Sequence, residues 1–428
     1  MQRCLVPVVK LVLLPLILVP GPITVMLNKP RFLFSLALLA LGAAPSPCRG
    51  DEPLALSGQT DQSALAASAW ERIKGFFAPP IEYQLEFGSY KSPRVFHDGS
   101  AVRTADDWSR RRREILHDWE RLLGKWPDLI TEPAIEILET RQREEIVQHR
   151  VRFQWTPNEK TNGYLLIPPG ESKRPAVVTV FYEPETAIGH GGMYRDFGIQ
   201  LARRGFVVLS IGTSEATQAK TYSLYYPRLE DAQVAPLSML AYAAANAWYV
   251  LASRPEVDSQ RIGIVGHSFG GKWAMFASCL FDRFACAAWS DPGIVFDDTR
   301  PSVNYWEPWY LGYHRPPWRK RGTMTGENPA RGLYPELIRA GHDLHELHAL
   351  MAPRPFLVSG GSEDPPQRWQ ALNHTIEVNR ILGYENRVAM TNRPDHSPNE
   401  ASNAAIYDFF QHFLQSDNAF RLETDGPR

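Results

Sequence analysis

The stretch "IGIVGHSFGGKWAMF", residues Ile262 to Phe276, decides the fold. It opens as an apolar strand and closes as a helix, and Ser268 stands at the joint. "GHSFG" fits the pattern G-x-S-x-G, in which small neighbours let the chain turn sharply and expose a serine. A serine that merely caps the helix would fit the same letters. The context favours a nucleophile, provided that a base and an acid follow further along the chain.

Two downstream loops supply such groups. His396 lies in "NRPDHSPNEASNAAIYDFFQHF", after a last strand and before a last amphipathic helix. Asp364 lies in "SGGSEDPP", after an apolar strand, and Asp291 lies in "AAWSDPG", after the preceding strand. A serine, then an acid, then a histidine is the chain order of the α/β-hydrolase triad. We favour Asp364 as the acid, because Asp291 before Pro292 is also explained as a turn residue.

The segments around this joint predict an α/β fold. From Pro133 onward, residues 134–144, 145–155 and 162–169 have the pattern of strands, and the first two alternate in part as antiparallel strands do. Units of strand, turn and helix follow. This order predicts a mostly parallel, doubly wound sheet with helices on both faces. We therefore expect a catalytic domain over residues 133–415 and a C-terminal tail over 416–428.

The residues before this domain form two predicted regions. Residues 1–50 are strongly apolar. The part from Met26 has two cations, then an apolar core, then small residues, and this order is typical of a secretory signal peptide. We expect a true start at Met26, a secreted or periplasmic protein, and no membrane contact beyond the export signal; a retained anchor is the alternative. Residues 51–132 are expected to form a linker up to about Ser63 and then a helical region.

Charge, cysteines and histidines narrow the possible partners. The 46 Lys plus Arg balance 47 Asp plus Glu, so the net charge of -1 provides no long-range field for nucleic acid. Cys279 and Cys286 either pair in an oxidising compartment or remain small buried thiols. His342, His345 and His348 recur every three residues, whereas a zinc helix needs two histidines four apart. We expect no metal and no organic cofactor.

Attack of a serine on an ester carbonyl would create an oxyanion that needs pre-placed donors. One candidate is the backbone N–H of Phe269, the residue after the nucleophile. The other should come from the loop after "PAVVTVF", which makes Tyr182 the candidate. The glycine-rich "GHGG" at residues 189–192 lies several residues beyond that strand and is interpreted as a flexible turn.

Two features are candidates for holding substrate. Lys272 stands in the first turn of a helix, where a cation is disfavoured by about 0.3 to 1 kcal/mol. It is interpreted either as a contact to a polar or anionic substrate or as an ordinary surface lysine. "NYWEPWYLGYHRPPW", residues 304–318, concentrates aromatic side chains, including Trp306 and Trp309. Aromatic faces can stack on sugar rings, although packing of the insertion would use the same residues.

The chain from about Pro133 to Phe413 resembles the α/β-hydrolase superfamily, and within it the carbohydrate esterases of the glucuronoyl esterase and acetyl xylan esterase type. "GHSFGGKWA", "NYWEPWY" and "HALMAPRPFLVSGGSED" carry the resemblance. It implies that Lys272 contacts a uronate sugar and that the acid follows either of two strands, which keeps Asp291 beside Asp364. Glucuronoyl esterases usually have arginine after the nucleophile, and this chain departs from them with Phe269.

These features predict an exported, monomeric serine esterase that cleaves a small-molecule or polysaccharide ester through an acyl-enzyme. A peptidase or a dienelactone-hydrolase-like enzyme on the same triad is the alternative among enzymes. A catalytically silent carbohydrate-binding homologue is the alternative outside them, since a fold alone does not determine function.

Overall fold

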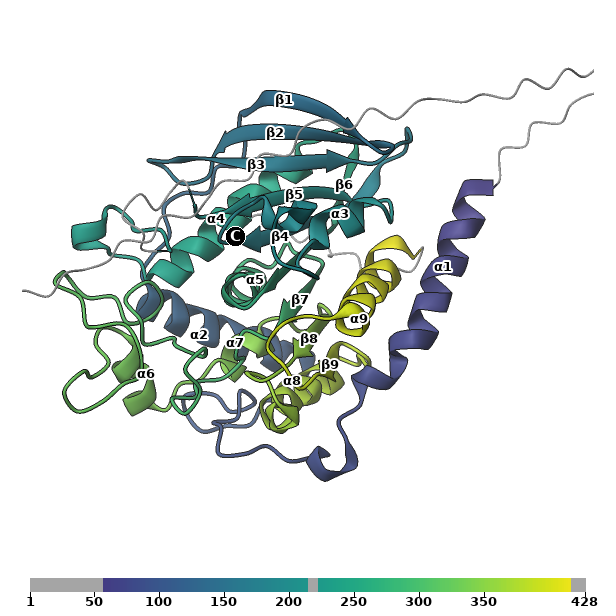
Figure 1. The fold of residues 1–428 in the computed structure, drawn as a ribbon. Coiled ribbons are helices and arrows are strands. Elements are labelled where there is room, and N and C mark those ends of the chain that lie inside the picture. The colour runs from purple at the N-terminus through teal and green to yellow at the C-terminus, as the bar shows by residue number, and fades with distance from the viewer. Residues whose placement is uncertain (1–56, 215–221, 417–428) are drawn as a thin grey trace, which may run out of the picture. The chain divides into compact units, whose positions relative to one another are not determined.

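The computed structural model describes residues 57–214 and 222–416, which belong to one compact unit (Figure 1). The predicted signal region, residues 1–50, and all but the first residue of the predicted tail lie outside the described residues. Among the helices that are described, none has the length and apolar character needed to cross a membrane.

The described residues form a sheet of nine strands in the order β1-β2-β3-β5-β4-β6-β7-β8-β9. The strands are β1 (Ile135–Arg143), β2 (Ile146–Gln154), β3 (Lys160–Ile167), β4 (Arg174–Phe181), β5 (Val207–Gly212), β6 (Val257–His267), β7 (Cys286–Ser290), β8 (Phe356–Gly360) and β9 (Val388–Asn392). β1, β2, β3 and β5 pair antiparallel, and every neighbouring pair from β5 to β9 is parallel. The mostly parallel sheet predicted from the sequence is confirmed.

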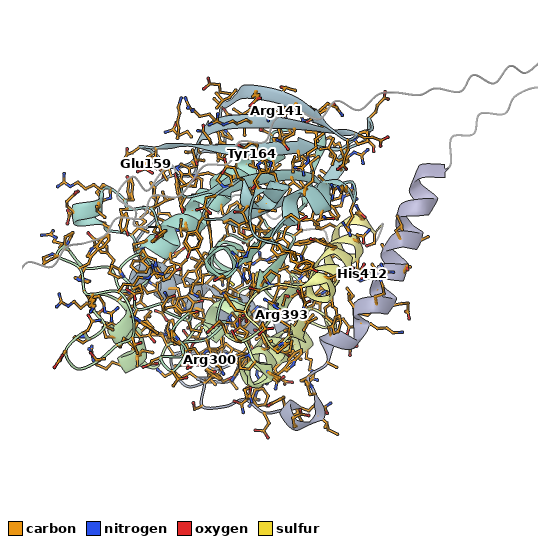
Figure 2. All side chains as sticks on the ribbon, viewed as in Figure 1. Arg141, Glu159, Tyr164, Arg300, Arg393 and His412 are labelled. Carbon is orange, nitrogen blue, oxygen red and sulfur yellow. The ribbon has the colours of Figure 1, made fainter. Side chains whose placement is uncertain are left out.

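Helices cover both faces of this sheet (Figure 1). They are α1 (Ser57–Ile73), α2 (Ala105–Leu123), α3 (Phe197–Ala202), α4 (Pro236–Ala252), α5 (Phe269–Leu280), α6 (Tyr334–Ala340), α7 (His345–Ala349), α8 (Trp369–Ile381) and α9 (Glu400–Phe410). Successive strand residues point to opposite faces, so Val178 packs with α4 and α5 while Val177 packs with α3 and α9. Side chains fill the space on both sides of the sheet (Figure 2).

The region before the sheet packs onto the same unit. Helix α1 begins at Ser57, inside the predicted linker, because small polar residues near a helix start do not prevent propagation from a packed segment. Arg72 of α1 donates two hydrogen bonds to Asp408 of α9, at 2.7 and 2.6 Å. On the other face, Trp119 of α2 donates from Nε1 to Glu346 at 3.0 Å. Helix α1 is thereby tied to α9, after the last strand, and α2 is tied to α7, between β7 and β8.

The two described cysteines and the spaced histidines have separate environments. Cys279 and Cys286 are buried free thiols, which settles their state in favour of the unpaired alternative. His342 contacts Glu346 at 2.8 Å, and His345 donates to the backbone oxygen of Lys91 at 2.6 Å. Within the described part of the chain, no group of three or more histidine, cysteine or acidic side chains is arranged to hold a metal.

His348 gives the first testable prediction. It is fully buried beside the stacked rings of Trp289 and Phe356, and burial lowers its pKa to about 3. The unfolded histidine has a pKa near 6.5, so the unfolded state binds more protons and stability falls as the pH falls below 6.5. From pH 6.5 to 5.0 this group alone should remove about 1.5 to 2 kcal/mol from the free energy of unfolding.

The substitution His348→Phe keeps a ring in the packing and removes the titration. In urea unfolding, the wild type should lose stability relative to H348F between pH 6.5 and 5.0. From pH 7.5 to 8.5, where both side chains are neutral, the two proteins should change in parallel. Parallel behaviour across the acidic range as well would contradict the assignment.

Candidate active site

Ser268 occupies a strained turn between β6 and α5. Its φ of 56° and ψ of -113° lie outside the usual regions for a residue with a side chain. Two glycines permit this turn: a Cβ on Gly270 would lie 2.0 Å from the oxygen of Val180, and one on Gly266 would lie 2.3 Å from Gly270. The Ser268 N–H donates to the oxygen of Ser290 at the end of β7, at 2.8 Å. The turn is therefore fixed from both neighbouring strands.

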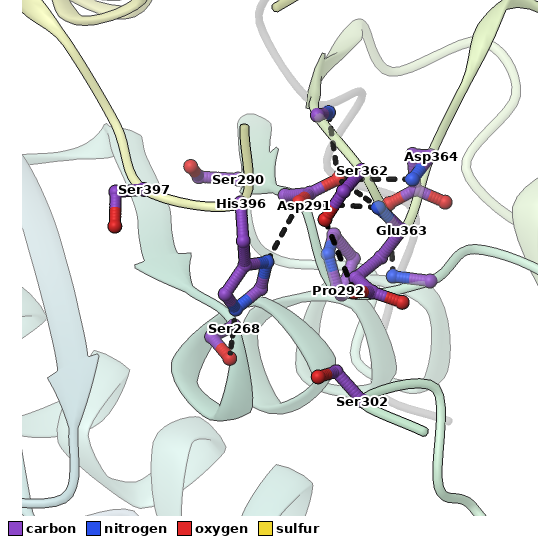
Figure 3. A network of polar contacts seen from close by, with 12 residues as sticks. Ser268, Ser290, Asp291, Pro292, Ser302, Ser362, Glu363, Asp364, His396 and Ser397 are labelled. Atoms are coloured by element: carbon purple, nitrogen blue, oxygen red, sulfur yellow. Dashed lines mark hydrogen bonds and ion pairs between the residues drawn. The ribbon is translucent and has the colours of Figure 1, made fainter. Parts of the chain in front are cut away.

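His396 lies between Ser268 and Asp291 (Figure 3). Its Nε2 is 2.8 Å from Ser268 Oγ, and its Nδ1 is 2.7 Å from Asp291 Oδ2. A carboxylate only accepts hydrogen bonds, so Nδ1 carries the proton and Nε2 is left to accept from the serine hydroxyl. The Asp291 side chain is fully buried, whereas that of His396 is 30% exposed.

The Asp291 carboxylate is held by the loop after β8. Oδ1 accepts from the backbone N–H groups of Gly361 at 2.6 Å, Asp364 at 2.9 Å and Glu363 at 3.2 Å. These N–H groups replace the hydrogen bonds to water that the carboxylate loses when it is buried. They also leave Oδ2 directed at His396.

The acid favoured from the sequence, Asp364, does not contact His396. Its carboxylate turns the other way and accepts from the backbone N–H groups of Gly293, at 2.8 Å, and Ile294, at 2.6 Å. Burial, together with the nearby charge of Asp291, raises the pKa of Asp364 to about 6. Asp291, and not Asp364, therefore lies beside the histidine. The loop after β8 donates backbone N–H groups to Asp291, and its own carboxylate, Asp364, accepts from the turn at residues 293–294.

The two oxyanion candidates lie next to each other. Phe269 is the first residue of α5, whose initial N–H groups have no partner within the helix. Tyr182 follows β4, and its backbone oxygen accepts from Thr213 at 2.8 Å and Ser214 at 2.9 Å. The rings of Phe269 and Tyr182 stack with centroids 4.1 Å apart. The structure therefore brings together the two peptides that the sequence singled out.

Comparisons with known proteins agree with this geometry. Residues 161–292 match the model of the Dienelactone hydrolase family. "Putative hydrolase YtaP" of Bacillus subtilis is 26% identical over 195 residues, which are 41% of this chain and 61% of that one. The glucuronoyl esterase of Solibacter usitatus superposes with a TM-score of 0.59 at 17% identity, over 77% of this chain and 99% of that one. The glucuronoyl esterase of Teredinibacter turnerae gives 0.56 at 18% identity, over 82% and 99%.

This chain has the α/β-hydrolase fold. The matched relative is covered over 61% of its length, so the comparison with it extends to part of that protein. The similarity to the solved esterases establishes the fold, whose strand order carries the serine, acid and histidine to one edge of the sheet.

The resemblance implies that Lys272 contacts a substrate. In the structure Lys272 is buried instead. Its exposed fraction is 2%, and Nζ donates to the backbone oxygens of Pro292 and Ser302. The ammonium lies 4.8 Å from the ring centroid of Tyr305. Burial lowers its pKa to about 8. Lys272 therefore fastens the nucleophile helix to the segment after Asp291.

The two tryptophans also differ from expectation. Trp306 is fully buried and donates from Nε1 to the oxygen of Gly322 at 3.1 Å, so it packs the insertion rather than presenting a face to sugar. Trp309 is 8% exposed and packs edge-on against Tyr222 at 6.2 Å. Tyr222, 38% exposed, is the ring of this group that reaches the surface. The sequence does not indicate this because packing and binding use the same residue types.

Sequence reasoning also missed Arg393, which lies three residues before His396 and touches the same loop. It is 8% exposed and donates to the backbone oxygen of His396 at 2.7 Å. Its position directly after β9 is the one signal in the sequence, because the carboxyl ends of parallel strands converge at the site.

Lys272 allows a test that separates the two roles. The substitution Lys272→Met keeps the aliphatic stem and leaves the buried carbonyl of Pro292 and the part-buried contact at Ser302 without their donor, which should cost about 1–3 kcal/mol of stability. Lys74→Met, at an exposed ion pair with Glu71, is the control and should change stability by less than about 0.5 kcal/mol. Urea unfolding at pH 7 measures both. Equal stability of K272M and wild type would restore Lys272 as a surface or substrate-facing residue.

Proposed function

We propose that this α/β-hydrolase cleaves carboxylic esters by a Ser268–His396–Asp291 triad. The observation that carries the proposal is the unbroken chain of short hydrogen bonds from Ser268 Oγ through both nitrogens of His396 to Asp291. A serine hydroxyl is a weak nucleophile until an adjacent base accepts its proton. Here the base has its accepting nitrogen on the hydroxyl and its protonated nitrogen on a buried carboxylate.

The reaction follows from this arrangement. Ser268 Oγ attacks the ester carbonyl while its proton passes to His396 Nε2, and Asp291 stabilises the resulting imidazolium. The N–H groups of Phe269 and Tyr182 bind the oxyanion. His396 then returns the proton to the alcohol as it leaves, and the acyl group remains on Ser268. Water, activated by the same histidine, attacks the acyl-enzyme and releases the acid.

The substrate we propose is an ester on a polysaccharide. Support comes from the fold shared with glucuronoyl esterases and from the rings beside Phe269. Tyr182 and Tyr222 pack edge-to-face at 5.4 Å, and Tyr222 is partly open to solvent, so a sugar ring has an aromatic surface to meet near the nucleophile. The predicted export signal agrees with a polymer outside the cell.

A dienelactone-hydrolase-like activity is the second candidate. The match of residues 161–292 to that family favours it, since those residues include both the serine and the acid. Both candidates use the same three residues and differ in the ester they accept.

Removal of the nucleophile tests the activity. The substitution Ser268→Ala should lower kcat on p-nitrophenyl acetate by about 10⁶-fold, as loss of the serine does in serine hydrolases. It should also abolish labelling by a fluorophosphonate probe. A panel of acetylated xylan, a methyl glucuronate ester and a dienelactone then separates the substrate classes. Hydrolysis that persists in S268A would reject the triad.

The choice of acid has its own test. In D291N the amide would donate to His396 Nδ1 and force the proton onto Nε2, so kcat should fall by about 10⁴-fold. D364N is the matched control, because its side chain is equally buried but contacts the turn at residues 293–294 and Arg368, and not His396. D364N should lose stability in urea while keeping kcat within about tenfold of wild type. The reverse ranking of the two kcat values would return the acid role to Asp364.

A further inference from the structure

Arg393 joins the strand ends beneath the site to the loop that carries His396. Nη1 donates to the backbone oxygens of Ser359, at 2.7 Å, and Gly360, at 3.2 Å. Nη2 donates to the oxygen of His396 at 2.7 Å, and Nε donates to that of Ser397 at 2.8 Å. One guanidinium thus spans from the end of β8 to the main chain of the proposed base.

The same guanidinium reaches two serine hydroxyls. Nη1 lies 3.1 Å from Ser359 Oγ, and Nη2 lies 3.4 Å from Ser290 Oγ at the end of β7. No ion pair involves Arg393 among residues 57–214 and 222–416; the hydrogen bonds to carbonyl and hydroxyl oxygens surround its charge. Arg393 is 8% exposed, whereas the side chain of Arg141 on the edge strand β1 is 67% exposed. Such a buried cation is retained at the cost of desolvation, which indicates a geometric role.

The contacts of the His396 ring lie on other elements. The ring is partly exposed, is hydrogen-bonded to Ser268 and Asp291, and lies 4.8 Å from the ring of His267 at the end of β6. Asn399 caps α9 through Ser402, at 2.8 Å, and so fixes the far end of the loop. At the near end, Asn392 Nδ2 donates to the oxygen of Asp364 at 2.8 Å, and the Arg393 side chain contacts the centre of the loop at His396 and Ser397.

We propose that Arg393 is a positioning residue: its planar fork holds the backbone of His396 and Ser397 against the ends of β7 and β8, so that both ring nitrogens stay within hydrogen-bond distance of their partners. This inference rests on the esterase function proposed above. Lysine cannot replace the fork, because a single ammonium cannot donate in three fixed, coplanar directions. A misplacement of about 1 Å at a reacting group can cost about 100-fold in rate.

Arg354 provides the matched control. It is also buried, at 3% exposure, and donates to the backbone oxygens of Ser278 at 2.8 Å, Phe284 at 3.1 Å and Leu350 at 3.1 Å. None of these contacts involves the triad. R393K and R354K therefore remove equivalent forks at two places, one beneath the proposed base and one away from it.

The experiment measures stability, kcat and KM for p-nitrophenyl acetate, and the rate of fluorophosphonate labelling, at a temperature well below each unfolding midpoint. Both variants should lose stability to a similar extent. R393K alone should lose about 100-fold in kcat and in labelling rate, with KM changed less than threefold. R393Q has no charge and a shorter side chain, and it should show the same kinetic loss. It takes the place of R393K in the experiment if R393K does not fold.

The outcomes separate the inference from the function on which it rests. Equal kcat values for R393K, R354K and wild type, or an equal fall in both variants, would overturn the positioning role. If instead wild type hydrolyses no ester and Ser268 is not labelled, the proposed function fails before Arg393 is tested. A further check is rescue: added methylguanidinium should raise kcat of Arg393→Ala toward wild type and leave R354A unchanged.

Discussion

The hydrogen bonds from the loop after β8 to the Asp291 carboxylate are the contact on which the site depends. They bring the ends of two parallel strands into one turn and aim one carboxylate oxygen at His396. The histidine in turn reaches Ser268, whose own N–H is held by the residue before Asp291. Contacts at the ends of β7 and β8 therefore hold Ser268, His396 and Asp291 in place.

The charged groups around the site are solvated by the backbone more than by each other. Asp291 and Asp364 accept from peptide N–H groups, and Lys272 and Arg393 donate to peptide oxygens. Peptide groups in strands and tight turns are fixed in place, so they hold a charge in one orientation without the freedom of a side-chain partner. The ion pair of Asp364 with Arg368, at 3.7 Å, adds to these peptide contacts, and the Coulombic gain of a buried pair often fails to repay its desolvation.

The local signals in the sequence were sufficient for the fold, the serine and the histidine. Gly266 and Gly270 mark a turn that no other residue tolerates, and His396 stands in the right loop after the last strand. The sequence favoured Asp364 as the acid, whereas Asp291 is the carboxylate beside His396, because the two follow adjacent parallel strands and differ in the direction of the side chain. Lys272 and Trp306 were misread for a related reason: their exposure is set by residues distant in sequence, such as Ser302 and Gly322.

The free thiols of Cys279 and Cys286 bear on how the chain folds and how it responds to oxidants. Burial raises the pKa of both, so neither is a ready nucleophile or an easy target for oxidants. The described unit is held together without any covalent cross-link, and its packing is indifferent to whether the surroundings are reducing or oxidising. Folding of the described residues therefore calls for no disulfide between these two thiols.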